Sequence, residues 1–367
     1  MGYHCSLDGS RNRNRFHSHG SRSVPTACLQ AVTVRSQIPK ITDVARAAGV
    51  SAATVSRVLN GSSAVSKALA AKVRKAAADL GYVPFSSARA LRRQHTRVWA
   101  AIVSDIENPF FTAVVRGIED VARKVQHRLV LCNSDEDLER EAAYIDVALA
   151  ERMAGVVIAV ASARESSLKP LMDAQLPVVA IDRAAGRDID AVVVDNHLGA
   201  EEATRHLIEN GSRRVACITG PTRVNTANER LEGYRRAVAD CGHKDETELI
   251  RRADYKETGG HEAALSLLTS RNPPDALFIA NNPMAVGALR AIRELGLSIP
   301  RDVALVAFDD SPWCALTSPP LSVVAQPAYE IGRVAAELLA TAGDKRTSRT
   351  IVLTPKLIPR ESSIRHR

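Results

Sequence analysis

Two groups of side chains in this sequence could do chemistry. One is a set of Lys and Arg residues near its start, and the other is the polar residues that follow short apolar runs further on. Residues 1–97 contain 16 Lys and Arg against three acids, a net charge of +13, whereas residues 98–367 carry a net charge of −5. A short basic segment on a mildly acidic body indicates that the segment meets a polyanion. The alternative at this point is a solvated basic tail.

Catalytic and metal-binding patterns are absent from the sequence. The six cysteines are scattered, with no Cys-x-x-Cys pair and no histidine at zinc-ligand spacing. We therefore expect reduced thiols and neither a metal nor another cofactor. No Gly-x-Gly-x-x-Gly follows a predicted strand, and neither a phosphate loop nor a Gly-x-Ser-x-Gly turn is present. The chain is not expected to be an enzyme.

Length and composition limit the architecture. A chain of 367 residues with 45% hydrophobic and 25% charged residues is typical of two or three globular domains. No apolar run reaches the roughly 18–20 residues that a membrane-spanning helix needs. The first residues contain no apolar signal region, so we expect a cytoplasmic protein without a membrane partner.

The basic segment contains the pattern of three short helices. Apolar residues from Ile41 to Ala48 recur at helical spacing, with Thr42 as the expected N-cap and Gly49 as the stop. Ser51 can cap a second helix over residues 52–59. A third is expected over residues 66–80. The inward-facing residues expected on the second and third helices are Val55, Val58, Leu59, Leu69, Val73, Ala76, Ala77 and Leu80. This order is a helix-turn-helix arrangement.

The run ITDVARAAGVSAATVSRVLNG at 41–61, followed by LGYVP at 80–84, resembles the DNA-binding head of the lactose-repressor (LacI/GalR) family. The resemblance extends over essentially the whole chain. It implies a transcriptional regulator, acting as a repressor in the family's common mode. Its affinity for palindromic double-stranded operator DNA would be controlled by a small carbohydrate-like effector. Residues 354–367 lack a sustained leucine heptad, so a homodimer is expected rather than a tetramer.

The N-terminal end of the second helix would lie in the major groove of the DNA. Its outward residues Ala52 and Ala53 can offer methyl contacts, and Arg57 can bind guanine O6 and N7 with two hydrogen bonds. Ser51, Thr54 and Asn60 are suited to phosphate contacts. For Ser51 and Asn60 the alternative is plain helix capping, and for Arg57 a solvated surface position.

Residues 85–97 form the expected linker. Ser86 to Arg93 has good helix propensity but too few apolar residues to pack alone. The resemblance implies a hinge helix that orders on DNA and inserts Leu91 into the minor groove beside Arg89 and Arg92. The alternative is that Leu91 packs under the linker. Residues 1–38 show no periodicity and are expected to be disordered, either as a basic arm or as an extension from a misassigned start.

From Val98 onward, short β-branched runs alternate with amphipathic helical stretches, which predicts parallel sheets covered on both faces. The resemblance implies a two-lobed core like that of periplasmic sugar-binding proteins. The expected domains are an extension (1–38), a helix-turn-helix head (39–84), a hinge (85–97) and the core (98–367). Lobe 1 would comprise residues 98–196 and 327–350, and lobe 2 residues 197–326 and 351–367.

Ligands in such folds bind where strands end, so polar residues after each run are the candidates. Acids, amides and an arginine around an aromatic face suit a sugar or sugar acid. The effector-binding residues that the resemblance implies are Phe110, Phe111, Asp182, Asp195, Asn225, Arg230, Tyr255, Asn281, Asp309 and Gln326.

Two positions depart from the family pattern. Val224 stands where the purine-sensing member has an arginine, which argues against a purine effector. Asn282 stands where many members have aspartate, and Pro283 follows it, so its role is open. Two other functions are considered. A transport receptor would share the body but predicts a signal peptide and no basic head. An α/β enzyme would need a catalytic motif that is missing.

Overall fold

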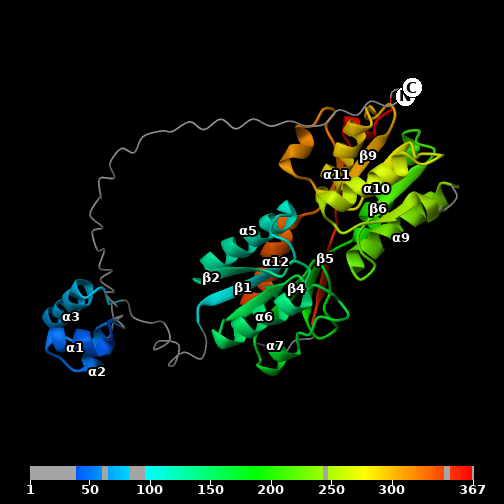
Figure 1. The fold of residues 1–367 in the computed structure, drawn as a ribbon. Coiled ribbons are helices and arrows are strands. Elements are labelled where there is room, and N and C mark those ends of the chain that lie inside the picture. Colours follow the sequence, from blue (N-terminus) through cyan, green and yellow to red (C-terminus); the bar gives the residue numbers. More distant parts are fainter. Residues whose placement is uncertain (1–38, 60–64, 83–95, 243–246, 343–347, 366–367) are drawn as a thin grey trace, which may run out of the picture. The chain divides into compact units, whose positions relative to one another are not determined.

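The computed structural model describes residues 39–59, 65–82, 96–242, 247–342 and 348–365. The chain divides into two units at Pro84, the head and the core, which are drawn in Figure 1. The predictions for residues 1–38, for Asn60 and for the hinge residues Arg89, Leu91 and Arg92 lie outside the described residues. None of the described helices combines the length and apolarity needed to cross a membrane.

The head is a three-helix unit of α1 (Ile41–Ala48), α2 (Ala52–Leu59) and α3 (Lys67–Asp79). Its core is made of small and β-branched side chains, among them the fully buried Val44, Val55 and Val73. Gly49 ends α1 with a φ of 64°, a left-handed conformation that glycine adopts without strain. This turn brings α2 against α1, as the helix-turn-helix pattern predicts.

Several details of the predicted head are wrong. The N-cap of α1 is Lys40 rather than Thr42, because the Asp43 carboxylate accepts the Lys40 amide 2.8 Å away, so the helix starts two residues earlier. Leu80 lies at the C-cap of α3 and is 38% exposed, so it does not belong to the core. Leu69 is only partly buried and lies outside the core, whereas Ala70 near the start of α3 and Tyr82 after its end pack against the core.

The core contains two six-stranded sheets, one in each lobe. The first sheet is entirely parallel. Its strands are, in spatial order, β11 (Thr350–Leu353), β5 (Asp190–Val194), β4 (Val178–Ile181), β3 (Gly155–Ile158), β1 (Val98–Val103) and β2 (Arg128–Asn133). The β-branched runs of the sequence predicted buried parallel strands in a sheet covered on both faces, but they did not predict the order of the strands.

The second sheet is parallel except for one edge strand. Its order is β12 (Lys356–Ile358), β10 (Ser322–Ala325), β9 (Ala304–Phe308), β8 (Ala276–Ile279), β6 (Val215–Thr219) and β7 (Ile250–Arg252). Strand β12 runs antiparallel to β10. Strands β10 and β12 were not among the predicted runs, and β12 has only three residues, which are too few to show a pattern.

Helices cover both faces of each sheet (Figure 1). On the first sheet they are α5 (Pro109–Lys124) with α12 (Ala328–Ala340), and α6 (Leu138–Ala150) with α7 (Lys169–Asp173). On the second they are α8 (Asn196–Glu209) with α9 (Asn225–Asp240), and α10 (Glu257–Leu268) with α11 (Asn282–Glu294). Gly332 of α12 lets that helix approach α5 closely, since a Cβ there would lie 1.9 Å from the Val114 carbonyl oxygen.

The chain passes between the lobes three times, and one of these crossings was placed wrongly from the sequence. Residues 351–353 were assigned to lobe 2. Instead they form β11, which pairs with β5 in the sheet of lobe 1. The crossing follows at Thr354 and Pro355, before β12 joins the second sheet. The prediction failed because Thr350–Leu353 pairs with β5, a strand that is distant in sequence, and hydrophobic periodicity does not reveal such a pairing.

Candidate functional site

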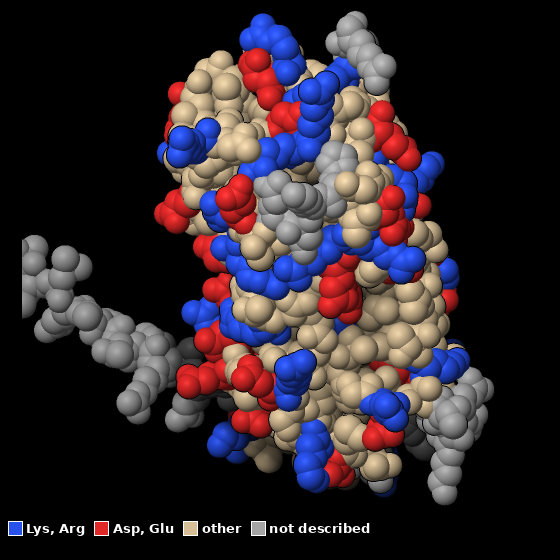
Figure 2. Space-filling model, turned by 90° about the vertical axis from the view of Figure 1, so that its right-hand side faces the viewer, with Lys and Arg blue, Asp and Glu red and all other residues tan. Residues whose placement is uncertain are grey.

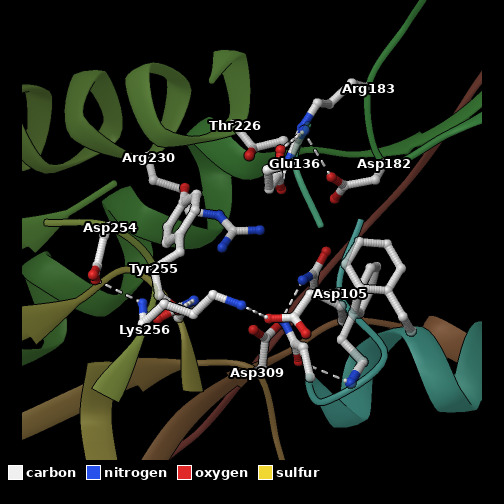
Figure 3. A pocket seen from close by; sticks show the side chains of 15 residues that line it. Asp105, Glu136, Asp182, Arg183, Thr226, Arg230, Asp254, Tyr255, Lys256 and Asp309 are labelled. Carbon is white, nitrogen blue, oxygen red and sulfur yellow. Dashed lines mark hydrogen bonds and ion pairs between the residues drawn. The ribbon is translucent and has the colours of Figure 1, made fainter. Parts of the chain in front are cut away.

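A cavity lies between the lobes, at the carboxyl ends of strands from both sheets, with about 510 Å³ of space that includes its opening to solvent (Figure 3). Lobe 1 contributes residues that follow β1, β2 and β4, and lobe 2 contributes residues that follow β7, β8, β9 and the start of α9. This is where parallel sheets bind ligands. The lining residues are Asp105, Asn108, Phe110, Phe111, Glu136, Asp182, Arg183, Thr226, Arg230, Asp254, Tyr255, Lys256, Asn281, Asp309 and Gln326.

Four of the lining residues have a left-handed backbone. The φ angles of Glu136, Asp182, Tyr255 and Asp309 are 58°, 64°, 65° and 77°. Residues other than glycine adopt this conformation at a cost and are enriched at ligand sites, where the surrounding structure holds them in place. In each case the turn directs the side chain out of the strand layer toward the cavity (Figure 3).

Arg230 is fixed by the wall of the cavity on three sides. Its Nε donates to Asn196 Oδ1 at 2.8 Å, and its Nη1 donates to the Ala280 carbonyl. Its guanidinium carbon lies 3.8 Å from the centre of the Phe308 ring, a cation–π contact. Nη2 has no hydrogen-bond partner among the described residues. This group is therefore free to donate to a ligand oxygen.

The opposite wall carries a buried ion pair. Arg183 donates to both carboxylate oxygens of Glu136, each at 2.7 Å, and to the Val160 carbonyl at 2.8 Å. Its Nε lies 3.2 Å from Asp182 Oδ2 without hydrogen-bond geometry. Burial raises the pKa of Asp182 and outweighs the charge of Arg183, which lowers it. The carboxylate of Asp182 keeps acceptor positions that only a ligand donor or a proton could satisfy.

Asp309 is the second buried carboxylate, 6% exposed. Gln326 Nε2 donates to its Oδ1, and the Asp309 amide is paired with Val324 of the neighbouring strand. Burial raises the pKa of Asp309, and the positive charge of Arg230 acts in the opposite direction. Asp309 and Arg230 therefore present an acceptor and a donor from the same lobe, which suits adjacent ligand hydroxyls.

Aromatic rings supply the apolar part of the cavity. Phe110 and Phe111 begin α5 and pack edge to face with their centroids 5.0 Å apart. The Tyr255 ring lies against the backbone at Gly220, where a Cβ would come within 2.4 Å of the ring, so only glycine fits there. The hydroxyl of Tyr255 is buried, and among the described residues no partner has good hydrogen-bond geometry to it. Burial raises the pKa of Tyr255, which Arg230 and the neighbouring Thr226 hydroxyl oppose.

Lys256 joins the two lobes across the cavity mouth. Its Nζ lies 2.7 Å from Asp105 Oδ2 and 3.4 Å from Asp135 Oδ1, both on lobe 1 (Figure 3). Partial burial lowers the pKa of Lys256, but hydrogen bonds and the charges of these carboxylates outweigh it, and the pKa is raised. The ion pair therefore links the two lobes at the cavity mouth.

Eight of the ten predicted effector residues line this cavity, and two do not. Asp195 is the N-cap of α8, where its carboxylate accepts the Leu198 amide at 2.9 Å. Asn225 begins α9, and the next residue, Thr226, faces the cavity instead. Asn225 is thus one residue away from a lining position, whereas neither Asp195 nor its neighbour Asn196 lines the cavity. Helix capping uses such residue types equally well.

Seven lining residues were not predicted: Asp105, Asn108, Glu136, Arg183, Thr226, Asp254 and Lys256. Most directly neighbour a predicted residue or follow a predicted strand, and that adjacency was the available signal. Asn282 does not line the cavity. Its amide donates to the Asp309 carbonyl oxygen at 3.4 Å and its carbonyl accepts the Trp313 indole N–H at 3.1 Å, so it supports the strand end.

On the head, the predicted DNA-contacting residues differ in exposure. Ser51, Ala53 and Arg57 are exposed. Ala52 instead packs partly against the helix core, so its methyl group is not a free surface contact. Ser51 and Thr54 join through their hydroxyls at 2.9 Å, and Ser51 Oγ also accepts the Thr54 amide. Capping therefore occupies part of the hydrogen-bonding capacity of this pair.

Charge also singles out the head. Residues 39–82 carry seven Lys and Arg against two acids. On the face of the core drawn in Figure 2, basic and acidic side chains are interspersed over both lobes. An excess of one sign favours a polyanion, whereas mixed charge does not. The head is accordingly the unit suited to DNA.

These features define a class of protein. A basic helix-turn-helix head on a two-lobed core that encloses a polar cavity is the architecture of a ligand-responsive DNA-binding regulator. Residues 40–84 match the model of bacterial regulatory proteins of the lacI family, and residues 204–363 match that of a periplasmic binding protein-like domain. The chain belongs to the LacI family of transcriptional regulators, which are not enzymes.

Named relatives and solved structures agree with this assignment. The chain is 34% identical to the transcriptional regulator RegA of Clostridium saccharobutylicum, over 88% of this chain and 99% of that protein. It is also 34% identical to the ribose operon repressor of Escherichia coli K12, over 88% and 98%.

Among solved structures, the complex of regulator CelR with cellobiose matches with a TM-score of 0.67 and 34% identity, over 88% of this chain and 99% of that one. The lac repressor dimer bound to operator and an anti-inducer matches with a TM-score of 0.75 and 25% identity, over 90% and 100%.

Proposed function

We propose that the chain represses transcription as a homodimer on a palindromic operator, and that a neutral sugar bound between the lobes controls its affinity for that operator. The observation that carries this proposal is the cavity of Figure 3, where Arg230 keeps a free donor, Asp182 and Asp309 keep free acceptors, and two phenylalanines form an apolar wall. Hydroxyls on one side and C–H groups on the other are the surface of a sugar ring.

The charge of the lining supports a neutral effector over a sugar acid. Five acids and three bases line the cavity. Arg183 is already paired with Glu136, and Lys256 with Asp105. Arg230 therefore remains as the one lining cation without a carboxylate partner among the described residues, facing two buried carboxylates. An anionic ligand would meet a net excess of negative charge in a low-dielectric site.

The names of relatives give the first compounds to try. One relative is named a ribose operon repressor, and one structural neighbour is complexed with cellobiose. Other relatives are named as the transcriptional repressor PurR. In this chain Val224 is buried at the N-cap of α9 and does not line the cavity, which supports a sugar rather than a purine.

Dimerisation is supported by exposed apolar side chains on lobe 1. Val130 and Leu131 are 40% and 46% exposed on β2, an edge strand of the first sheet. Exposed Val125 lies at the end of α5 just before β2, and exposed Leu138 and Val147 lie on α6 just after it. Exposed apolar residues on an edge strand are typical of an association surface. Two copies would present two Arg57-bearing helices to the two halves of a palindrome.

Coupling between the two ligands follows from linkage. If the sugar prefers one arrangement of the lobes and DNA prefers another, each ligand must change the affinity for the other by the same factor. The sugar then acts as an inducer or a corepressor according to which arrangement it shares with DNA.

The test combines thermal shift with DNA binding on the full chain. D-ribose, D-glucose and cellobiose are screened by thermal shift, with gluconate and guanine as comparison ligands. A bound sugar raises the melting temperature. Fluorescence anisotropy on the protein's own upstream DNA, with and without that sugar, then measures coupling. Stabilisation by guanine or gluconate alone, or equal affinity for random and palindromic duplexes, contradicts the proposal.

A further inference from the structure

A second hollow adjoins the cavity at its mouth. It holds about 830 Å³ of space open to solvent and lies between the start of α5 on lobe 1 and the starts of α10 and α11 on lobe 2. Its wall combines an indole ring and apolar groups (Trp313, Pro109, Pro283 and Val286) with the carboxylates of Glu107 and Glu257. The effector-binding role proposed above uses none of these six residues.

Trp313 is held rigidly in this wall. Its indole N–H donates to Asn282 Oδ1 at 3.1 Å. Asn282 is only 2% exposed, and its side-chain amide donates to the backbone carbonyl oxygen of Asp309. The side chain of Asp309 lines the inner cavity. The half-buried indole therefore presents a fixed ring to the hollow, and the position of that ring is tied to an effector-binding strand end. A fixed aromatic ring is a platform for the C–H face of a sugar or for another ring.

The inner cavity and the outer hollow adjoin at Asp105 and Lys256, which line both. Neighbours in sequence also divide between the two, since Asn108 and Asn281 line the cavity whereas Pro109 and Asn282 line the hollow. A substituent that leaves the inner ring at the mouth therefore enters the hollow beside the Asp105–Lys256 ion pair.

Lys256 provides a donor at the junction. An ammonium group has three N–H donors. Asp105 Oδ2 at 2.7 Å and Asp135 Oδ1 at 3.4 Å account for two of them. The third is available to an oxygen that links two rings at the mouth. The negative side chains of Glu107 and Glu257 disfavour a phosphate or carboxylate in the hollow.

We propose that this hollow is an outer subsite, which binds the second ring of a neutral disaccharide or aryl glycoside against Trp313 while the first ring occupies the inner cavity. This inference rests on the proposed function, because it assumes a sugar in the inner cavity. It adds that the effector has two rings.

Calorimetry on the full chain tests the subsite with matched ligands. D-glucose is compared with cellobiose and with phenyl β-D-glucoside, and D-ribose with phenyl β-D-riboside. We expect a two-ring compound to bind roughly tenfold more tightly than its parent sugar, and Trp313→Ala to remove that advantage while the parent sugar still binds. Leu316→Ala is the control, because Leu316 is 83% exposed three residues further on and does not line the hollow.

Fluorescence gives a second readout that does not depend on a loss-of-binding variant. The sequence has two tryptophans, and Trp99 is buried against His127, 4.7 Å between ring centroids. In Trp99→Phe the emission reports Trp313 alone. The two-ring compound should protect this emission from acrylamide quenching more than the parent sugar does.

The outcomes separate the two proposals. If parent and two-ring compounds bind equally, or if Trp313→Ala weakens both by the same factor, the outer subsite is wrong and the sugar-binding cavity stands. If no sugar in the panel binds, the proposed function fails and the outer subsite fails with it. A two-ring preference that Trp313→Ala abolishes and Leu316→Ala keeps supports the subsite.

Discussion

Arg57 is the residue that would separate sequence reading from general attraction to DNA. It is exposed on α2, with no ion pair among the described residues. Arg57→Ala should cost about 1–3 kcal/mol of binding free energy on the cognate operator and relax specificity at one base pair. Anisotropy titrations against operators with each base pair replaced in turn would measure this.

The control for Arg57 is Arg46→Ala on α1, which removes an equally charged and 81% exposed side chain. It should weaken binding to all duplexes by a similar and smaller factor, since phosphate attraction carries no sequence information. A uniform loss on all duplexes in Arg57→Ala would contradict base reading.

Asp309→Asn should weaken effector binding without lowering the stability of the folded chain. Effector affinity should fall roughly 10- to 100-fold, because a hydrogen bond to a charged group contributes about 1.5–3 kcal/mol. Burial raises the pKa of Asp309 in the folded chain. The folded chain therefore binds this proton more readily than the unfolded chain, and its free energy of unfolding decreases as pH rises from the usual aspartate pKa through the raised one.

Asparagine removes the cost of burying an ionised carboxylate at this position. The free energy of unfolding at pH 7 should therefore be unchanged or rise by up to about 1 kcal/mol. Calorimetry with the sugar and urea unfolding without it would measure the two effects. Asp310→Asn is the matched control, because that carboxylate pairs with Arg360 at 2.9 Å and does not line the cavity. An effector response that survives in Asp309→Asn would contradict its role.

Residue types at strand ends could be predicted from the sequence, but the direction of each side chain could not. Asp182 and Asp309 were predicted because each follows a clear apolar run. Asp195 follows one equally well, yet it caps α8. Lys256 could not have been predicted, because its two carboxylate partners lie on the other lobe, more than a hundred residues away in sequence.

At the scale of elements, the last described residues form a clasp on lobe 2. The η turn Glu361–Ser363 places Ser363 Oγ 2.7 Å from His206 Nε2 on α8 and 2.6 Å from Ser322 Oγ on β10. Ser362 Oγ donates to the Leu305 carbonyl on β9. A short turn without an apolar pattern thus ties a helix and two strands together through hydroxyl groups.

This clasp should weaken in mild acid. Burial lowers the pKa of His206 below its usual value of about 6.5, and the nearby Glu209 opposes this only in part. The unfolded chain then binds the proton more readily, so the free energy of unfolding should decrease as pH falls below about 6.5. His206→Gln should flatten this part of the profile. Urea unfolding between pH 5 and 8 would show it, and an unchanged slope in the variant would contradict it.

The fold itself was largely predictable at this scale. Apolar runs such as Val215–Thr219 and Val178–Ile181 became buried parallel strands, because β-branched runs that alternate with helical stretches fit a sheet covered on both faces. Strands of three or four residues at the edges, such as β12, depend on a neighbour for their pairing. The lobe boundary predicted at residue 350 was wrong for the same reason, because the sequence of β11 does not show which sheet this strand will pair with.

At the scale of the whole molecule, association should depend on β2. Leu131→Glu places a charge on an exposed apolar edge strand and should shift the protein from dimer to monomer. Operator affinity should then fall by roughly tenfold or more, because one head alone buries little surface on DNA. Light scattering and anisotropy would measure the two quantities.

The control for Leu131 is Met172→Glu on α7, a comparably exposed apolar residue of the same lobe. It should leave the molecular mass in solution unchanged. Sugar binding should persist in both variants, since neither residue lines the cavity. A dimer that survives in Leu131→Glu would place the interface elsewhere.

The three crossings between the lobes also have a consequence for synthesis on the ribosome. The first strands of lobe 1 are translated from Val98 onward. Helix α12 covers the sheet of this lobe and strand β11 extends it, but both are translated after nearly all of lobe 2. Until they are made, the nascent chain leaves exposed the apolar face that Ile331, Ala335 and Leu339 later cover. The second lobe is therefore translated while the first is still unfinished, and a chain that stops before Ala328 would be a target for chaperones and proteases.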